Sequence, residues 1–228
     1  VYPPLITKME NMGYSKMTKT NVYTYKRYYS DFLDKLGVSL DDHLELNEFE
    51  IPINHEAMIS WAEENEHRAT VKDYKPRPFV SEQSLREAVL TQELGYNKYN
   101  TTEINWGIEV QDDAILKDML GDEAFKIMNL KKDTCLVRLL RYDPGHCIPL
   151  HTDSYNGFKD RFGEGKVKRF FVAVSPWDWG HFLQVHDNMI HHWKPGYAVD
   201  IPNRVFHVSG NCGINPKYTL TITGFVND

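Results

Sequence analysis

The sequence predicts an α+β fold in which N-terminal helices precede a small barrel or jelly roll of antiparallel strands. Two observations carry this prediction. Before residue 130, apolar residues recur at the three- and four-residue spacing of amphipathic helices. From Thr134 onward, short runs rich in β-branched and aromatic residues alternate with turn residues, as in antiparallel β-proteins. The length of 228 residues fits one domain, with a helix-rich part at 1–130 and a β-rich core at 131–228.

Four segments of the N-terminal part have helical spacing: Val22–Leu36, Asn54–Glu64, Ser81–Leu94 and Asp112–Leu130. Asn54 and Ser81 are candidate N-caps, because their side-chain oxygens can accept hydrogen bonds from the first helical turn. Gly37 is suited to ending the first helix, and Gly121 divides the last segment into two short helices. Lys72–Phe79 contains two prolines, so we expect a loop there.

Seven strands are expected after residue 134: Cys135–Tyr142, Ile148–Asp153, Lys168–Val174, Phe182–Val185, Tyr197–Ile201, Val205–Val208 and Tyr218–Phe225. The third strand is apolar on both faces and should be covered on both sides. In the last strand, alternation places Lys217 and Thr219 on a polar face and Leu220 and Ile222 on an apolar one. The polar face suits a barrel interior, and the N-terminal helices are the available cover for the apolar face.

Composition narrows the class of protein. The net charge of −6 and the sequence pI of about 5.9 give no electrostatic footprint for nucleic acid. The three cysteines, Cys135, Cys147 and Cys212, are odd in number and lack C-x-x-C spacing, so we expect reduced, mostly buried thiols in a cytoplasmic protein. There is no run of 18 apolar residues and no charged-then-apolar leader, so no membrane partner is expected. The chain begins at Val1, which leaves open that a native N-terminal segment precedes it.

His151, Asp153 and His207 are the candidate metal ligands. Two imidazoles and one carboxylate form the three-ligand set that holds non-haem Fe(II) and leaves coordination positions open. Side chains at i and i+2 of a strand point to the same face, so His151 and Asp153 can grip one ion. His207 must then arrive from another strand. Lys217 follows ten residues later and offers a cation for an acidic co-substrate.

An H-x-D triplet alone carries little information, because such triplets arise by chance in a chain of this composition. The signal lies in the order of the motif, the intervening strands and the cation that follows. Other histidine pairs in this half are disfavoured as metal sites. His181 and His186 are five residues apart, and His191 and His192 are neighbours, so on a strand each pair faces opposite sides.

Three motifs stand in order along the C-terminal half: Tyr142-x-x-Gly145-x5-His151-x-Asp153, then Trp193-x-x-Gly196, then His207 with Lys217. In this order they resemble the 2-oxoglutarate/Fe(II) oxygenase superfamily. The first motif resembles prolyl hydroxylases, and the stretch from Trp193 to His207, followed by Asn211, resembles aspartyl/asparaginyl β-hydroxylases. The resemblance covers roughly Leu136 to Phe225. It implies a double-stranded β-helix, a cupin-like jelly-roll barrel, with the N-terminal helices packed on its outer face.

The resemblance implies that His151, Asp153 and His207 bind Fe(II). It also implies that Lys217, helped by the Thr219 hydroxyl, binds the distal carboxylate of 2-oxoglutarate. A lysine ammonium is a compact charge suited to a carboxylate at the bottom of a pocket. Simpler interpretations remain open: structural histidines with satisfied hydrogen bonds for the triad, and an exposed lysine after a proline turn for Lys217.

Tyr142 and Arg169 are further candidates for binding the co-substrate. Tyr142 could bond 2-oxoglutarate, but an ordinary core tyrosine fits the sequence equally well. Arg169 stands at the start of a central strand and could reach 2-oxoglutarate or the substrate. A rim charge or a strand-end salt bridge is the simpler interpretation of Arg169.

These residues together predict an Fe(II)- and 2-oxoglutarate-dependent dioxygenase that uses O2 to hydroxylate an unactivated C–H bond and releases succinate and CO2. By the resemblance, the first choice of substrate is an amino-acid side chain, free or in a peptide or protein. Alternatives are a small metabolite, a nucleobase, or a non-enzymatic cupin-like protein that binds a metal or ligand. Lys217-x-Thr219 discriminates the last alternative, because such a protein has no need for a buried cation at that spacing.

Overall fold

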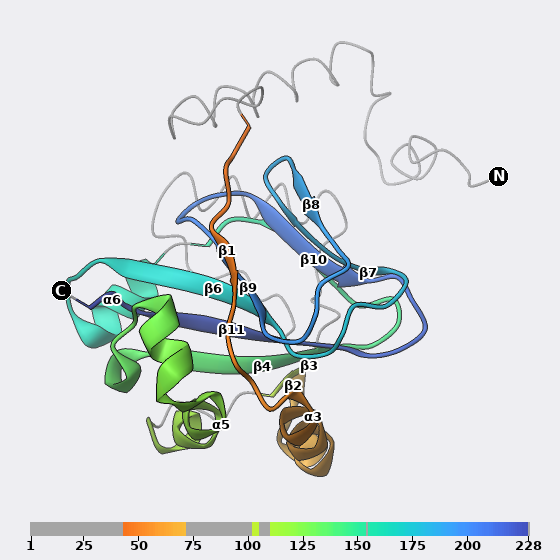
Figure 1. Ribbon diagram of the computed structural model, residues 1–228, viewed down its shortest axis with the longest axis horizontal. Helices are drawn as coiled ribbons and strands as arrows, with labels where there is room; N and C mark the ends of the chain where they lie inside the picture. The colour runs from red at the N-terminus through yellow and green to blue at the C-terminus, as the bar shows by residue number, and fades with distance from the viewer. Residues whose placement is uncertain (1–42, 72–101, 105–109, 154, 228) are drawn as a thin grey trace, which may run out of the picture. The chain divides into compact units, whose positions relative to one another are not determined.

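The computed structural model describes residues 43–71, 102–104, 110–153 and 155–227. The chain divides into two units, 1–43 and 44–228, and almost all of the described residues belong to the second. Two antiparallel sheets make up the centre of the second unit (Figure 1). The helices expected at 22–36 and 81–94, and the loop expected at 72–79, lie outside the described residues.

The larger sheet has seven strands in the order β1 (Glu48–Glu50), β9 (Tyr197–Asp200), β6 (Val167–Ala173), β11 (Lys217–Phe225), β4 (Leu136–Tyr142), β3 (Thr102–Ile104) and β2 (Thr70–Val71). The smaller sheet has four strands in the order β5 (Cys147–His151), β10 (His207–Asn211), β7 (His181–Val185) and β8 (Asn188–Ile190). All seven strands expected from the sequence are present, with ends that differ by a few residues. The prediction of a closed barrel is wrong for the described residues, because each of the two sheets has two unpaired edges there.

The helices of the described part are α3 (His55–Glu64), α5 (Val110–Met128) and α6 (Asn156–Phe162), with short 3-10 turns at Glu66–Arg68 and Lys132–Thr134. Asn54 is the N-cap of α3, as expected, since its side chain accepts a hydrogen bond from the Ala57 amide at 3.1 Å. Gly121 interrupts α5 with φ 71° and ψ 164°. The expected division of this segment into two helices is therefore confirmed.

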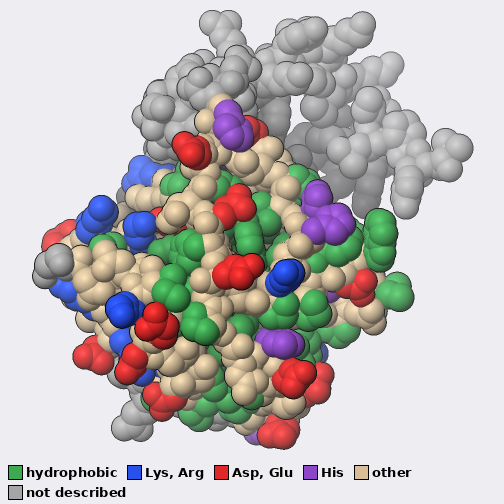
Figure 2. Space-filling view, in the orientation of Figure 1, with side chains coloured by type: hydrophobic (Ala, Val, Ile, Leu, Met, Phe, Trp, Pro, Cys, Tyr) green, Lys and Arg blue, Asp and Glu red, His purple; other side chains and the backbone are tan. Residues whose placement is uncertain are grey.

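The surface of the described part carries mixed charge. On the face shown in Figure 2, lysine and arginine side chains are interspersed with aspartate and glutamate. Within the described residues, none of the helices has the length and apolar character that crossing a membrane requires. All three cysteines, Cys135, Cys147 and Cys212, are free. The expectation that they are mostly buried is wrong, because Cys135 is buried, Cys147 is half-buried and Cys212 is exposed.

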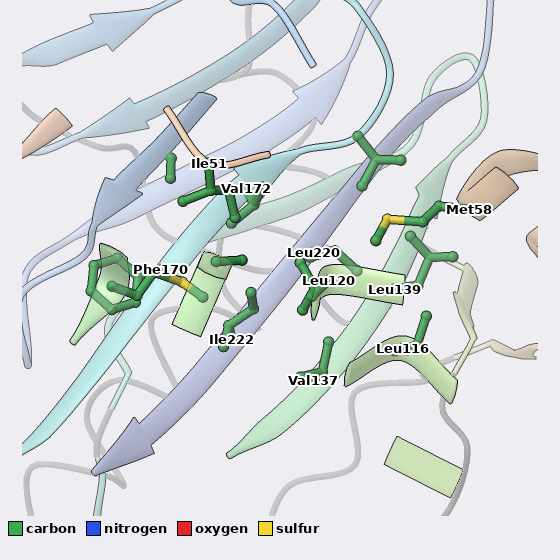
Figure 3. Packing of buried hydrophobic residues seen from close by; sticks show 14 of the residues in the cluster. Ile51, Met58, Leu116, Leu120, Val137, Leu139, Phe170, Val172, Leu220 and Ile222 are labelled. Carbon is green, nitrogen blue, oxygen red and sulfur yellow. The ribbon is translucent and has the colours of Figure 1, made fainter. Parts of the chain in front are cut away.

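The main apolar core lies between the larger sheet and the helices α3 and α5 (Figure 3). Met58 of α3 and Leu116 of α5 are fully buried in it. Leu220 and Ile222 of β11 face the same cluster, as the alternation of the sequence predicts. Among the described residues, α3 and α5 therefore contribute side chains to the core on this face, and the other helices expected before residue 130 lie outside them.

A second apolar cluster lies between the two sheets. Phe171 and Ala173 of β6 point into it, and it also receives Leu183 and Val185 of β7. Phe170 and Val172 point the other way, into the helix-covered core. The prediction that this strand is covered on both sides is confirmed. Lys217, at the start of β11, donates to Phe182 of β7 and Ser209 of β10, so this face of β11 points towards the smaller sheet.

Gly196, in the expected Trp193-x-x-Gly196 motif, lies in the turn before β9 with φ +89°. A Cβ atom there would stand 2.3 Å from the Ile51 carbonyl oxygen. Because both the backbone conformation and the close approach require glycine, Gly196→Ala should lower the free energy of unfolding by about 2 kcal/mol. Urea unfolding of both chains measures the difference.

Gly157→Ala is the matched control for this substitution. Gly157 lies in α6, and its added Cβ would meet no atom within 4 Å. Alanine is the better helix former by up to about 1 kcal/mol, so this change should leave stability unaltered or raise it. Equal destabilisation by both substitutions would contradict the role given to Gly196.

Candidate metal centre

His151, Asp153 and His207 come together at one end of the smaller sheet. His151 ends β5, His207 begins β10, and the two are paired across the ladder. Their ring centroids are 4.2 Å apart, and one ligand atom from each of the three residues lies within 4.8 Å of the others. Among the described residues, no other group of three histidine, cysteine or acidic side chains is gathered in this way.

The placement of Asp153 differs from the sequence expectation. β5 ends at His151, so Asp153 lies beyond the strand rather than on its inner face. The Arg204 amide donates to the Asp153 backbone carbonyl at 3.0 Å and fixes the segment from outside the sheet. The pairing of β5 with β10 also shifts register between His207 and Ser209. Such an irregularity re-aims side chains at the end of a strand.

The tautomer of His207 is set by its neighbour. Nδ1 of His207 lies 3.0 Å from the Val205 carbonyl oxygen, which can only accept, so Nδ1 donates its proton. Nε2 is left with a lone pair, and it faces the Asp153 carboxylate at 3.3 Å. Two acceptors at this separation repel unless a proton or a metal ion lies between them. The arrangement therefore suits a cation.

Asp153 is strongly held in its charged form. Burial opposes ionisation, but a proton shared with His207 and the positive charge of Arg169 keep the pKa of this carboxyl well below its usual range. Arg169 forms an ion pair with the Asp153 carboxylate. Its Nε also donates to the Thr223 hydroxyl at 2.9 Å, and its guanidinium lies 5.6 Å from the centre of the Tyr155 ring. Arg169 is thus bound at the Asp153 end of the site.

Lys217 lies at the other end of the inner face of β11 and has no exposed surface. Its ammonium donates to the Phe182 carbonyl at 2.7 Å, the Ser209 hydroxyl at 2.7 Å and the Gly210 carbonyl at 3.2 Å. The interpretation of Lys217 as an exposed lysine after a proline turn is therefore excluded. Burial lowers the pKa of Lys217 to about 7.

Tyr142 forms one wall of the Lys217 environment. It is paired with Lys217 across β4 and β11, and the lysine ammonium lies 4.5 Å from the centre of its ring. Tyr142 is almost fully buried, at 2% exposure. This position serves core packing and a cation–π contact together. Contact with a co-substrate remains a proposal for Tyr142.

Thr219 lies two residues from Lys217 on the same face and is fully buried. Its hydroxyl oxygen finds no hydrogen-bond partner within the described part of the chain. A buried hydroxyl without a partner costs free energy, on the order of 1–3 kcal/mol in proteins. The Thr219 hydroxyl is thus an unpaired polar group on the face of β11 that carries Lys217.

Sequence reasoning missed several residues of the site. Ser209 follows His207 by two residues and binds the Lys217 ammonium, so strand alternation from His207 would have found it. Tyr155 donates its hydroxyl to the Ile201 carbonyl at 2.7 Å, which braces the segment after Asp153 against β9. The Phe182 carbonyl is a backbone group, and no sequence signal points to it.

Comparison with known proteins adds little to this geometry. No family model and no curated protein matches the sequence. Among solved structures, the chain is similar to a prolyl-4-hydroxylase from Pseudomonas putida, at 14% identity and a TM-score of 0.45 over 80% of this chain and 92% of that one. It is also similar to a predicted oxalate decarboxylase from Thermotoga maritima, at 11% identity and a TM-score of 0.32, covering 55% of this chain and 81% of that one.

A third similar structure is a cupin 2 conserved barrel domain protein from Rhodopseudomonas palustris. Identity is 16% and the TM-score is 0.29, and the match covers 42% of this chain and 55% of that one. At these identities and TM-scores the similarities carry no argument about fold or function. The two-sheet fold is established by its own strand order, and the candidate centre by its own contacts.

The pKa of Lys217 predicts how stability depends on pH. Its folded value, about 7, lies below its ordinary value of 10.5. Between these values the unfolded chain binds a proton that the folded chain does not, so the free energy of unfolding rises with pH through this window. Above it, lysine is neutral in both states and burial no longer opposes folding. Below it, both states are charged and the penalty is complete.

Lys217→Met removes this group while keeping most of its volume. The free energy of unfolding of the wild-type chain, minus that of the variant, should rise with pH between about pH 7 and about pH 10. The rise should be at most about 1.4 kcal/mol per pH unit. Urea unfolding of both chains at several pH values measures the difference, and the other titrating groups cancel between them. A difference that does not change with pH would contradict the assignment.

Proposed function

We propose that this chain is an Fe(II)- and 2-oxoglutarate-dependent dioxygenase that hydroxylates an unactivated C–H bond, with release of succinate and CO2. The observation that carries the proposal is that two groups of polar side chains lie at opposite ends of the site, and we call these two groups its poles. A cluster of two imidazoles and one carboxylate stands at one end, and the buried Lys217 ammonium with the unpaired Thr219 hydroxyl stands at the other.

The spacing of the poles suits a short dicarboxylate. Ser209 contacts the Lys217 ammonium, and His207 lies two residues along the same strand. Two residues of strand correspond to about 7 Å, a span that a five-carbon keto diacid can bridge. Thr219, on the facing strand, has its hydroxyl free to donate to the carboxylate at the Lys217 end.

The triad fits the metal that this reaction requires. Two imidazole nitrogens and one carboxylate suit Fe(II), and three protein ligands leave positions for co-substrate and O2. Bound there, iron together with 2-oxoglutarate supplies the oxidising chemistry, since decarboxylation of the keto acid provides two electrons for O2 reduction. His207 presents Nε2 because Val205 holds its other nitrogen, and Asp153 is kept charged.

Arg169 receives a different role from the one expected. Its guanidinium is engaged by the Asp153 carboxylate and the Thr223 hydroxyl, at the metal end of β11. We therefore propose that Arg169 orients Asp153, leaving the distal carboxylate of 2-oxoglutarate to Lys217. The strand-end salt bridge considered for Arg169 agrees with this contact.

The alternative of a non-enzymatic metal-binding protein is less well supported. Such a protein has no use for a buried lysine surrounded by interior carbonyls, hydroxyls and aromatic rings. Burying an ammonium is costly, and Lys217 is fully buried, so a carboxylate partner at this position supports the proposal of a dicarboxylate co-substrate. For the organic substrate we keep an amino-acid side chain, free or in a peptide, as first choice. A small metabolite is second and a nucleobase third.

A succinate-release screen tests the proposed function. The full chain is incubated with Fe(II), O2 and 2-oxoglutarate and offered free amino acids, peptides, small metabolites and single-stranded nucleic acid in turn. Succinate should require protein and Fe(II), and an amino-acid or peptide pool should stimulate it. The His207→Ala chain, assayed in parallel, gives the background. Succinate no higher than this background in every pool would contradict the proposal.

A further inference from the structure

His191 and His192 lie in the turn between β8 and β9, and both are exposed. The residues on either side are buried: Ile190 is 8% exposed and Trp193 is 5% exposed. The Trp193 indole donates to the Ser175 carbonyl at 3.2 Å, which ties this end of the turn to the end of β6. The two imidazoles therefore stand at the surface on a backbone that is anchored on both sides.

The two rings face each other, which corrects the expectation that they point to opposite sides. That expectation assumed a strand, but β8 ends at Ile190. His192 has a left-handed backbone conformation, with φ 59°. This turn of the chain brings the rings together, with centroids 4.4 Å apart and planes at 77°, and the two Nδ1 atoms are in direct contact.

Trp177 holds this arrangement from the side. Its indole stacks on the His192 ring, with centroids 3.9 Å apart and planes at 28°. The Trp177 amide donates to the Trp193 carbonyl at 3.1 Å, so the stacking residue and the turn are fixed to each other. Left-handed backbone costs free energy in a residue other than glycine and often marks a functional position.

The chemistry of two facing Nδ1 atoms points to a shared cation. When one of the two Nδ1 atoms carries a proton, their contact is a hydrogen bond. When both rings carry their protons on Nε2, both Nδ1 atoms present lone pairs towards the same point. A metal ion accepts both at once. Imidazole nitrogen is a good ligand for Zn(II), Cu(II) and Ni(II), and water can complete the coordination of an exposed ion.

We propose that His191 and His192 form a second, surface metal site for a divalent transition-metal ion. The two Nδ1 atoms occupy adjacent coordination positions, and solvent supplies the rest. The site shares no residue with the cluster of His151, Asp153 and His207, and it does not depend on the proposed oxygenase activity. With two protein ligands, it should bind more weakly than the three-ligand centre.

Calorimetric titration of the full chain with Ni(II) under anaerobic conditions tests this site. The wild-type chain should bind a tight and a weak equivalent. His191→Ala and His192→Ala should each lose the weak equivalent and keep the tight one. His207→Ala should lose the tight equivalent and keep the weak one, so the two sites are separated. His67→Ala, which removes an exposed histidine elsewhere, should keep both.

Fluorescence gives a second, local measurement. Ni(II) bound beside His192 should quench the stacked Trp177 indole, and Trp177→Phe should remove that part of the quenching while keeping the weak equivalent. Unchanged Ni(II) binding in both His191→Ala and His192→Ala would overturn the proposal. The proposal would also be overturned if the wild-type chain bound a single equivalent of Ni(II) and the His207→Ala chain bound none. If His207→Ala still bound the tight equivalent of Ni(II), the result would count against the oxygenase proposal alone.

Discussion

Replacing His207 with alanine is expected to lower 2-oxoglutarate turnover on the order of 10³-fold or more, because the metal loses one of three protein ligands. His207 is buried at 6% exposure, and the Val205 carbonyl loses its donor, so stability should also fall by about 1–3 kcal/mol. Circular dichroism at low temperature establishes whether the variant is folded. Mn(II) binding, followed by its electron paramagnetic resonance signal, then measures the loss of the site.

His67→Ala is the matched control for this experiment. His67 is exposed, lies in the 3-10 turn Glu66–Arg68, and contributes nothing to the cluster of ligand atoms. Turnover and Mn(II) affinity should equal those of the wild-type chain. A folded His207→Ala chain that retains wild-type Mn(II) affinity would contradict the assignment of the metal centre.

The second large effect is expected at the opposite pole. Lys217→Ala should raise the apparent KM for 2-oxoglutarate by about 10²-fold or more, since a lost hydrogen bond to a charge costs on the order of 3 kcal/mol when the partner stays buried. Metal affinity should change far less, because Lys217 is not a ligand. Lys217→Met keeps more of the packing and should show the same effect on KM. Initial rates of succinate release at varied 2-oxoglutarate measure both.

Thr219→Val separates ligand binding from folding at the same pole. Valine has a similar shape but no hydroxyl, and the Thr219 hydroxyl has no partner among the described residues. The ligand-free variant should therefore be more stable than the wild-type chain by about 1–2 kcal/mol, while its KM for 2-oxoglutarate rises by about tenfold. A purely structural threonine would not produce these opposite signs. If KM is unchanged in both the Lys217 and Thr219 variants, Arg169 and Arg204 become the next candidates.

Much of the fold was predictable because strand alternation and helix periodicity are local properties. The two faces of β11 could be assigned from the sequence, since lysine and threonines alternate with tyrosine, leucine and isoleucine there. The short strands β1, β2, β3 and β8, of two or three residues each, were missed, because so short a run has no visible alternation. Whether the sheets close depends on which edges pair, and pairing between distant segments leaves no local signal.

The candidate site shows the same division. His151, His207 and Lys217 were predicted from their order, and the structure brings the histidines together and buries the lysine. The position of Asp153 beyond its strand, the engagement of Arg169 by Asp153 and the carbonyl partners of Lys217 depend on tertiary contacts. The facing rings of His191 and His192 depend on one backbone angle that the sequence does not reveal.

Anaerobic calorimetric titration with 2-oxoglutarate, with and without Fe(II), is the most direct test of the central claim that the two poles bind one metal and one keto diacid. We predict that 2-oxoglutarate binds the Fe(II)-loaded chain tightly. We also predict much weaker binding to the metal-free chain, to Lys217→Met with Fe(II), and to His207→Ala under either condition. Binding that is equally strong in all five cases, or absent from the Fe(II)-loaded wild-type chain, would contradict the claim.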